Sequence, residues 1–170
     1  MAHTFRKATI ADHDQIWEIL QAAILRRKLD GSQQWQDGYP NPDLVIKDIY
    51  QQAGFVLEDA ALIVGYCAIF VNDEPAYKDI EGTWLSDGDF IAVHRVAIAS
   101  NYLGKGLARE IMLNIEEHAI KENIYSIKAD TNFDNPAMMN IFDKLGYLYC
   151  GEVFFRGNAR RAYEKILTTK

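Results

Sequence analysis

The chain has 170 residues and a formal net charge of −6, with 49% hydrophobic and 25% charged residues. This composition excludes intrinsic disorder for most of the chain, and the length fits about one domain that closes its own core. The acidic balance argues against a nucleic-acid partner bound through its phosphates, because such binding requires a basic face. We therefore expect one domain that spans residues 1–170.

The cysteines and the hydropathy pattern indicate a cytoplasmic protein. Cys67 and Cys150 are the only cysteines and lie among apolar residues, which favours buried reduced thiols over a disulfide or a zinc site. Residues 1–9 lack the apolar run of a signal peptide. No apolar run reaches the ~18–20 residues that cross a bilayer. We expect no membrane partner and no metal, and the sequence fits either a monomer or a homodimer.

Apolar residues spaced three and four apart predict a long first helix after a short strand at residues 4–7. The helix begins at Asp12, which forms a capping-box signature with Gln15, and it runs to about Leu29.

The next segment predicts a second helix and a pair of strands. A loop with two prolines and a glycine lies at residues 35–42 and leads into a helix with Asp43 as its N-cap. Strands at residues 55–58 and 61–71 then pair around a turn at residues 59–60.

The centre of the chain holds the strand that we expect in the middle of the sheet. Residues 72–89 form a connection with six acidic residues and one lysine. The nearly continuous apolar run at residues 90–98 is typical of a strand buried on both faces. A helix over residues 105–122 and a strand over residues 125–132 follow.

The C-terminal part predicts one more helix and two strands. Asn135 is the expected N-cap, with a proline in the first helical position, and Gly146 ends the helix. Strands at residues 147–153 and 161–167 flank a turn at residues 157–158. The order β-α-α-β-β-β-α-β-α-β-β predicts a single mixed-sheet α/β domain.

The segment at residues 93–108 carries the clearest chemical signal. A buried strand leads through a turn with Gly104 and Gly106 into the start of an amphipathic helix. Small residues let the backbone approach a ligand, and the free N–H groups of a helix start favour an anion such as a pyrophosphate. For the glycine pair alone, a plain strand–turn–helix junction is the favoured explanation, and the turn is neither a Walker A loop nor a dinucleotide fingerprint.

Several motifs in the right order resemble the Gcn5-related N-acetyltransferases (GNAT). Residues 101–106, Asn-Tyr-Leu-Gly-Lys-Gly, are similar to motif A of that family, Arg/Gln-x-x-Gly-x-Gly/Ala, with Asn101 as a departure. Residues 142–147, Phe-Asp-Lys-Leu-Gly-Tyr, are similar to motif B, Tyr-Glu-Lys-Leu-Gly-Phe. The opening Arg-x-Ala-Thr-x-x-Asp at residues 6–12 resembles the first strand and helix cap of the family.

This resemblance implies a GNAT fold and acetyl-CoA as the acetyl donor. The expected binding elements are the central strand, which pairs with the pantetheine arm, the glycine turn, which holds the pyrophosphate, and the motif B helix, which lies beside the arm and the thioester. The implied cofactor-binding residues are Val96, Ala97, Ile98, Leu103, Gly104, Lys105, Gly106, Leu107, Ala108, Arg109, Asn135 and Phe142. A helix cap alone also explains Asn135.

The resemblance implies an oxyanion donor and leaves the proton-transfer groups open. The backbone N–H of Ile98 is the implied donor to the thioester carbonyl. His94 is the candidate base, with Asp89 second, and a hydrogen-bonded histidine within the sheet is the alternative interpretation of His94. Phe142 replaces the tyrosine that often protonates the leaving thiolate. Tyr102, Tyr147 and Tyr149 are near in sequence, and none matches the family position.

The function implied is an N-acetyltransferase that moves acetyl directly from acetyl-CoA to a primary amine of a small molecule or peptide. The alternative is a CoA-binding module of the same fold without transfer activity. Trp35 and Tyr39 either line the acceptor site or close the edge of the core. Arg95 either binds an acidic group of the substrate or pairs with a neighbouring carboxylate. The acidic connection either attracts a cationic amine or is a solvated loop.

Overall fold

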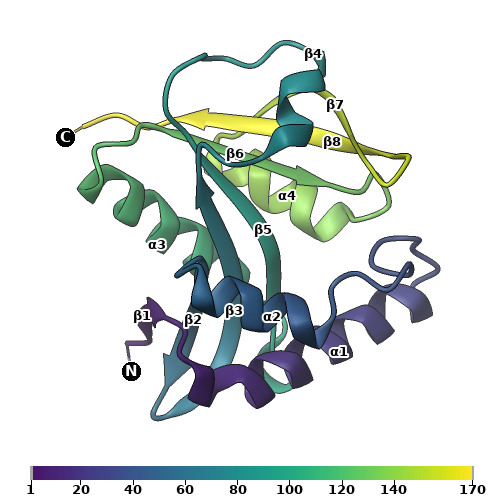
Figure 1. Cartoon of the computed structure of the whole chain (residues 1–170), viewed down its shortest axis with the longest axis vertical. Coiled ribbons are helices and arrows are strands. Elements are labelled where there is room, and N and C mark those ends of the chain that lie inside the picture. The colour runs from purple at the N-terminus through teal and green to yellow at the C-terminus, as the bar shows by residue number, and fades with distance from the viewer. Residues whose placement is uncertain (1, 170) are drawn as a thin grey trace. The chain divides into compact units, whose positions relative to one another are not determined.

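The structure is a computed structural model that describes residues 2–169, and it contains both helices and strands (Figure 1). The elements in chain order are β1 (Thr4–Lys7), α1 (His13–Leu29), α2 (Pro42–Tyr50), β2 (Gly54–Asp59), β3 (Leu62–Val71), β4 (Glu81–Gly82), β5 (Ile91–Ile98), α3 (Leu107–Lys121), β6 (Ser126–Thr131), α4 (Pro136–Leu145), β7 (Leu148–Phe155) and β8 (Asn158–Ile166). Short 3-10 turns lie at residues 10–12, 75–79 and 100–102.

The predicted mixed α/β class is confirmed, and the strands form an eight-stranded mixed sheet. The predicted element order is one strand short, because β4 lies inside the segment that we expected to be an unstructured connection. Two residues are too few to produce an alternating pattern in the sequence, and β4 exists only through its antiparallel pairing with β7. Among the described residues, none of the helices combines the length and apolar character needed to span a membrane.

The residues cluster into two compact units, Met1–Ile69 with Arg95–Asn114 and Phe70–His94 with Ile115–Lys170. The elements β3, β5 and α3 therefore contribute residues to both units. The hydrogen-bonded strand order is β1-β2-β3-β5 in the first unit and β5-β6-β8-β7-β4 in the second.

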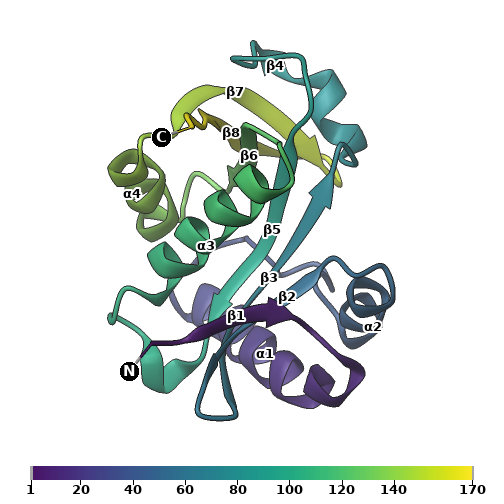
Figure 2. The same cartoon turned by 90° about the vertical axis from the view of Figure 1, so that its left-hand side faces the viewer.

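The core of the first unit lies between α1 and the antiparallel strands β1, β2 and β3. The apolar stripe of α1 supplies Ile16, Ile19, Leu20 and Ala23, all of which are buried. Figure 2 shows α1 and α2 next to each other, and Val45 of α2 joins the same core. Burial of this stripe is what holds α1 in place, because an isolated helix of its length is marginal in water.

The predicted start of α1 at Asp12 is confirmed, since Asp12 is its N-cap, whereas the predicted box with Gln15 is wrong and so is the predicted cap of α2. Asp12 is not the cap of a box with Gln15, because its carboxylate instead accepts from the Thr9 N–H, at 2.7 Å, in a 3-10 turn before α1. The Gln15 side chain accepts from the backbone of β3. In α2 the N-cap is Asn41 rather than Asp43, and the Asn41 side chain accepts from the Leu44 N–H.

The second unit is built on β5 to β8. The start of β5 runs parallel to β6, and β8 lies antiparallel between β6 and β7. Figure 2 shows α4 beside β7 and β8, and Phe142 of α4 packs its ring 4.7 Å from that of Tyr163 on β8. The predicted ends of α4 are confirmed, since Asn135 caps its start and Gly146 ends it in the left-handed conformation.

Candidate functional site

The glycine turn after β5 presents a row of unpaired backbone donors. Gly104 and Gly106 adopt φ angles of +75° and +80°, which a residue with a side chain rarely adopts. Within residues 2–169, no hydrogen bond is recorded for the backbone N–H groups of residues 104–109. Unpaired N–H groups at the positive end of a helix attract anions, and a Cβ added at either glycine would meet open space.

The C-terminal end of β5 has one edge whose backbone groups could pair with an added extended segment. Pairing of β5 with β6 is recorded only at Ile91, Ala92 and Val93. The Ala99 N–H donates to the Val64 carbonyl oxygen of β3 at 2.9 Å. Since successive residues of a strand direct their N–H groups to opposite edges, the Ile98 N–H points away from β3. Arg26 donates to the Ile98 carbonyl oxygen at 3.1 Å and so fixes this part of the backbone.

His94 lies in the second unit between two carboxylates. Its Nε2 is 2.7 Å from Glu74 Oε2, without the alignment of a hydrogen bond, and its Nδ1 is 3.8 Å from Asp130 Oδ1. Asp130 also accepts from the Tyr77 hydroxyl at 2.6 Å. Burial raises the pKa of Asp130, while the charge of His94 acts in the opposite direction. The second candidate base, Asp89, accepts from the exposed Asn72 side chain instead.

The two residues expected from motif B also lie in the second unit. Asn135 is the N-cap of α4, where its side chain accepts from the Met138 N–H at 3.3 Å. Phe142 is buried, at 1% exposure, with its ring 5.4 Å from Tyr147. Both positions are explained by the fold, and their roles toward a cofactor stay predictions.

Arg95 is occupied by a buried network in the first unit. Its guanidinium donates to the Asp48 carboxylate at 2.6 Å and 3.0 Å, and to the Tyr39 hydroxyl at 2.6 Å. Asp48 also accepts from the Tyr66 hydroxyl. Trp35 and Tyr39 pack against the core of this unit. The structure therefore favours the pairing role for Arg95 and the core-edge role for both aromatic residues.

The site is thus resolved into two groups of residues. The first unit brings together Val96, Ala97 and Ile98 with residues 103–109, and the second unit holds His94, Asn135 and Phe142. A comparison with models of protein families identifies the family of the chain. The model of the acetyltransferase (GNAT) family matches residues 15–147. The chain belongs to the acetyltransferase (GNAT) family.

Solved structures agree with the GNAT assignment over the whole chain. A GNAT acetyltransferase from Streptococcus agalactiae is 33% identical, with 98% of this chain and 96% of that chain covered, and a TM-score of 0.91. A GNAT acetyltransferase from Listeria monocytogenes is 20% identical, with 97% and 95% covered and a TM-score of 0.78. None of the curated proteins matches.

A more distant structure includes the donor. It is a proposed acetyltransferase from Salmonella typhimurium, solved with its cofactor acetyl-CoA. That protein is 18% identical, with 100% of this chain and 96% of that chain covered and a TM-score of 0.70, so it supports the fold alone.

The GNAT chain offers few free tyrosines to protonate a leaving thiolate. The Tyr102 hydroxyl donates to Asp59 at 3.0 Å, and Lys105 lies over its ring. Burial and the nearby Glu116 carboxylate raise the pKa of Tyr147. Tyr149 is 55% exposed on β7, with Arg161 over its ring.

Three charged residues of the second unit were missed by the sequence analysis. Glu74 contacts His94, and Lys128 and Glu164 lie buried on β6 and β8. A signal existed, because Ser126, Lys128 and Asp130 alternate with apolar residues along β6. This pattern indicates one polar face of a buried strand, and polar groups in such a position need partners.

Proposed function

We propose that this chain transfers acetyl directly from acetyl-CoA to a primary amine of a small molecule or peptide. The observation that carries the proposal is the row of free N–H groups at residues 104–109. A pyrophosphate fits these donors because each N–H pairs with an anionic oxygen without a competing acceptor. Acetyl-CoA, when bound, supplies an acetyl group activated as a thioester.

The first unit would bind and polarise the donor. The free edge of Val96, Ala97 and Ile98 would accept the pantetheine arm as an added strand. The Ile98 N–H, directed away from β3, would stabilise the oxygen of the tetrahedral intermediate. Arg26, bound to the Ile98 carbonyl oxygen, would keep this backbone segment in position.

The second unit would supply the base. An acceptor amine must lose a proton near neutral pH, because a free alkyl ammonium has a pKa near ~10.4. His94 is our candidate for the base. Its contact with Glu74 places a carboxylate beside the ring, to which the accepted proton could pass. The tyrosine often used for leaving-group protonation is absent at Phe142, so the thiolate would leave unassisted, which a thiol of pKa ~8.5 permits.

The alternative is a CoA-binding module that does not transfer acetyl. The buried Phe142, which carries no proton, is the observation that favours it. Both functions predict acetyl-CoA binding, so only turnover separates them.

The test is a panel of primary amines incubated with acetyl-CoA and purified protein. We expect at least one amine to gain one acetyl group by mass spectrometry while free CoA thiol is released at the same rate. Thermal stabilisation by acetyl-CoA, but not by ATP, should accompany it, since saturation at 100 times Kd adds about 2.7 kcal/mol. Stabilisation without acetylation of any amine would favour the binding module, and stabilisation by ATP alone would contradict both.

A further inference from the structure

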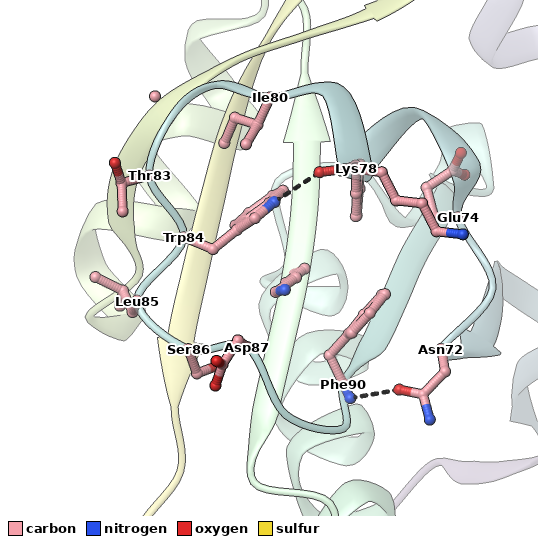
Figure 3. A pocket seen from close by; sticks show the side chains of 13 residues that line it. Asn72, Glu74, Lys78, Ile80, Thr83, Trp84, Leu85, Ser86, Asp87 and Phe90 are labelled. Atoms are coloured by element: carbon pink, nitrogen blue, oxygen red, sulfur yellow. Dashed lines mark hydrogen bonds between the residues drawn. The ribbon is translucent and has the colours of Figure 1, made fainter.

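A cavity of about 670 Å³ lies within the second unit, apart from the glycine turn. Its apolar lining includes Tyr77, Ile80, Trp84, Leu85 and Phe90. Figure 3 shows the Trp84 and Phe90 side chains pointing into the space that the connection encloses. This volume is in the range of small-molecule sites, which are mostly apolar with a few polar groups.

Lys128 of β6 lines this cavity with a buried charge. The residue is only 4% exposed, and its ammonium lies 4.6 Å from the ring centre of Trp84 and 4.3 Å from that of Phe90. In the described part of the chain, no hydrogen bond or ion pair is recorded for this ammonium. Buried lysines are rare unless paired with an anion, and two aromatic rings replace only part of the lost hydration.

The nearest carboxylate, that of Glu164, stabilises the lysine charge through space but has no hydrogen-bond acceptor site left for it. Glu164 of β8 is completely buried, and its carboxylate accepts from the Leu85 N–H, the Ser86 N–H, the Ser86 hydroxyl and the Ser126 hydroxyl. These four hydrogen bonds fill the acceptor sites of a carboxylate. Glu164 therefore fixes the cavity wall, while Lys128 keeps its donors for another partner.

The wall that faces Lys128 is fixed by further hydrogen bonds. The Trp84 indole N–H donates to the Tyr77 carbonyl oxygen at 2.9 Å. The Phe90 N–H donates to the Asn72 side chain, and the Asn72 N–H donates to the Phe90 carbonyl oxygen. Both aromatic rings around the ammonium are thus held before a ligand arrives, which lowers the entropic cost of binding.

We propose that this cavity binds a small apolar molecule that carries one carboxylate, with the carboxylate on Lys128 and the apolar body along the remaining apolar lining, which includes Ile80 and Leu85. A single negative charge fits best, because Glu164 and the exposed Asp87 would repel a second one. Glu74, which contacts His94, lines the same cavity. The ligand is then the acetyl acceptor itself, an amine that also bears a carboxylate, and this last step rests on the proposed function.

The test uses four matched probes without acetyl-CoA, measured by isothermal titration calorimetry. L-Phenylalanine carries both an amine and a carboxylate, 3-phenylpropanoate lacks the amine, phenethylamine lacks the carboxylate, and 3-phenylpropanamide is the neutral analogue. We expect saturable binding of the two carboxylates, at least tenfold tighter than that of the amide and of phenethylamine. This comparison needs only the wild-type protein.

Two lysine variants locate the carboxylate. Lys128→Met removes the charge at nearly constant shape and should weaken 3-phenylpropanoate at least tenfold. Lys121→Met removes an exposed lysine at the end of α3 that does not line the cavity, and it should change the affinity less than twofold. Equal affinity for the amide, tighter binding of phenethylamine, or unchanged binding in Lys128→Met would overturn the assignment.

Turnover measurements show whether the bound carboxylate belongs to the acetyl acceptor. If the acceptor carries it, L-phenylalanine is acetylated and Lys128→Met raises its KM more than it lowers kcat. If 3-phenylpropanoate binds but no carboxylate-bearing amine is acetylated, the cavity holds a carboxylate ligand other than the acceptor, and the acceptor assignment fails. Acetyl-CoA binding, measured separately by thermal shift, shows whether the proposed function fails with it.

Discussion

At the scale of single residues, the second unit concentrates charge around one imidazole. His94 faces Glu74 and Asp130, and the rings of Tyr77 and Phe155 lie 6.1 Å from its own. The distances differ, since Nε2 lies within contact of a carboxylate and Nδ1 does not. The contact of Nε2 with Glu74 lacks the alignment of a hydrogen bond, so it does not assign the ring proton, and a general base requires one of the two ring nitrogens to be unprotonated.

Replacement of His94 tests this role directly. His94→Ala should lower kcat by about a hundredfold or more, the usual contribution of a positioned base, and remove the acid limb of the pH–rate profile. The measurement is kcat against pH with the best amine of the panel. His13→Gln, at a half-buried histidine of α1, should keep the wild-type profile. An acid limb that persists in His94→Ala would assign the base to another group.

At the scale of elements, the turn between β5 and α3 combines two backbone requirements. Gly104 and Gly106 must hold positive φ angles, and the helix must begin at Leu107 with its first N–H groups unpaired. Only the combination aims consecutive donors at one place.

A substitution in this turn should separate binding from stability. Gly106→Ala forces an L-residue into the left-handed region at a cost of roughly 1–2 kcal/mol, so the turn relaxes and the donors lose their alignment. We expect acetyl-CoA affinity to fall about tenfold, or about 1.4 kcal/mol. Gly31→Ala is the matched control, with φ of +79° and open space around it. It should lower stability to a similar extent and leave acetyl-CoA affinity unchanged, and equal affinity losses in both would argue against the cradle.

The sequence was sufficient for elements whose signal is local. The apolar stripes predicted α1 and α3, and the cap residues predicted both ends of α4. The two-residue β4 was missed because it depends on tertiary pairing with β7. The capping box of Asp12 was assigned to the wrong partner, although its partner Thr9 is equally local in the sequence. In the candidate site, the glycine turn could be predicted because its signal is local. The cavity around Lys128 could not, because it is formed by segments that lie far apart in the sequence.

At the scale of the whole molecule, the net charge of −6 includes five exposed carboxylates in the connection at residues 72–89, namely Asp73, Asp79, Glu81, Asp87 and Asp89. Two carboxylates of the connection at residues 72–89 have structural partners, since Glu74 contacts His94 and Asp89 accepts from Asn72. The same connection covers a cavity whose buried charge is a lysine. On the proposal that this cavity binds the acceptor, an acceptor with both charges fits it better than a purely cationic amine does.

Stability should depend on pH through a carboxylate that links β1 to the start of α1. Arg6 donates to both oxygens of the buried Asp12, at 2.8 Å and 3.0 Å, and holds the pKa of Asp12 below its ordinary value of 3.8. Because the folded-state pKa is lowered, the stabilisation is complete above the unfolded pKa and is lost as pH falls through the folded one.

Asp12→Asn should therefore lower the free energy of unfolding by about 1–2 kcal/mol at pH 7. Urea unfolding at several pH values should show this difference vanish in acid, where Asp12 itself is protonated. Asp14→Asn, at a side chain that is 99% exposed, should change little at any pH, and a pH-independent loss in Asp12→Asn would mean that shape, not charge, is the cause.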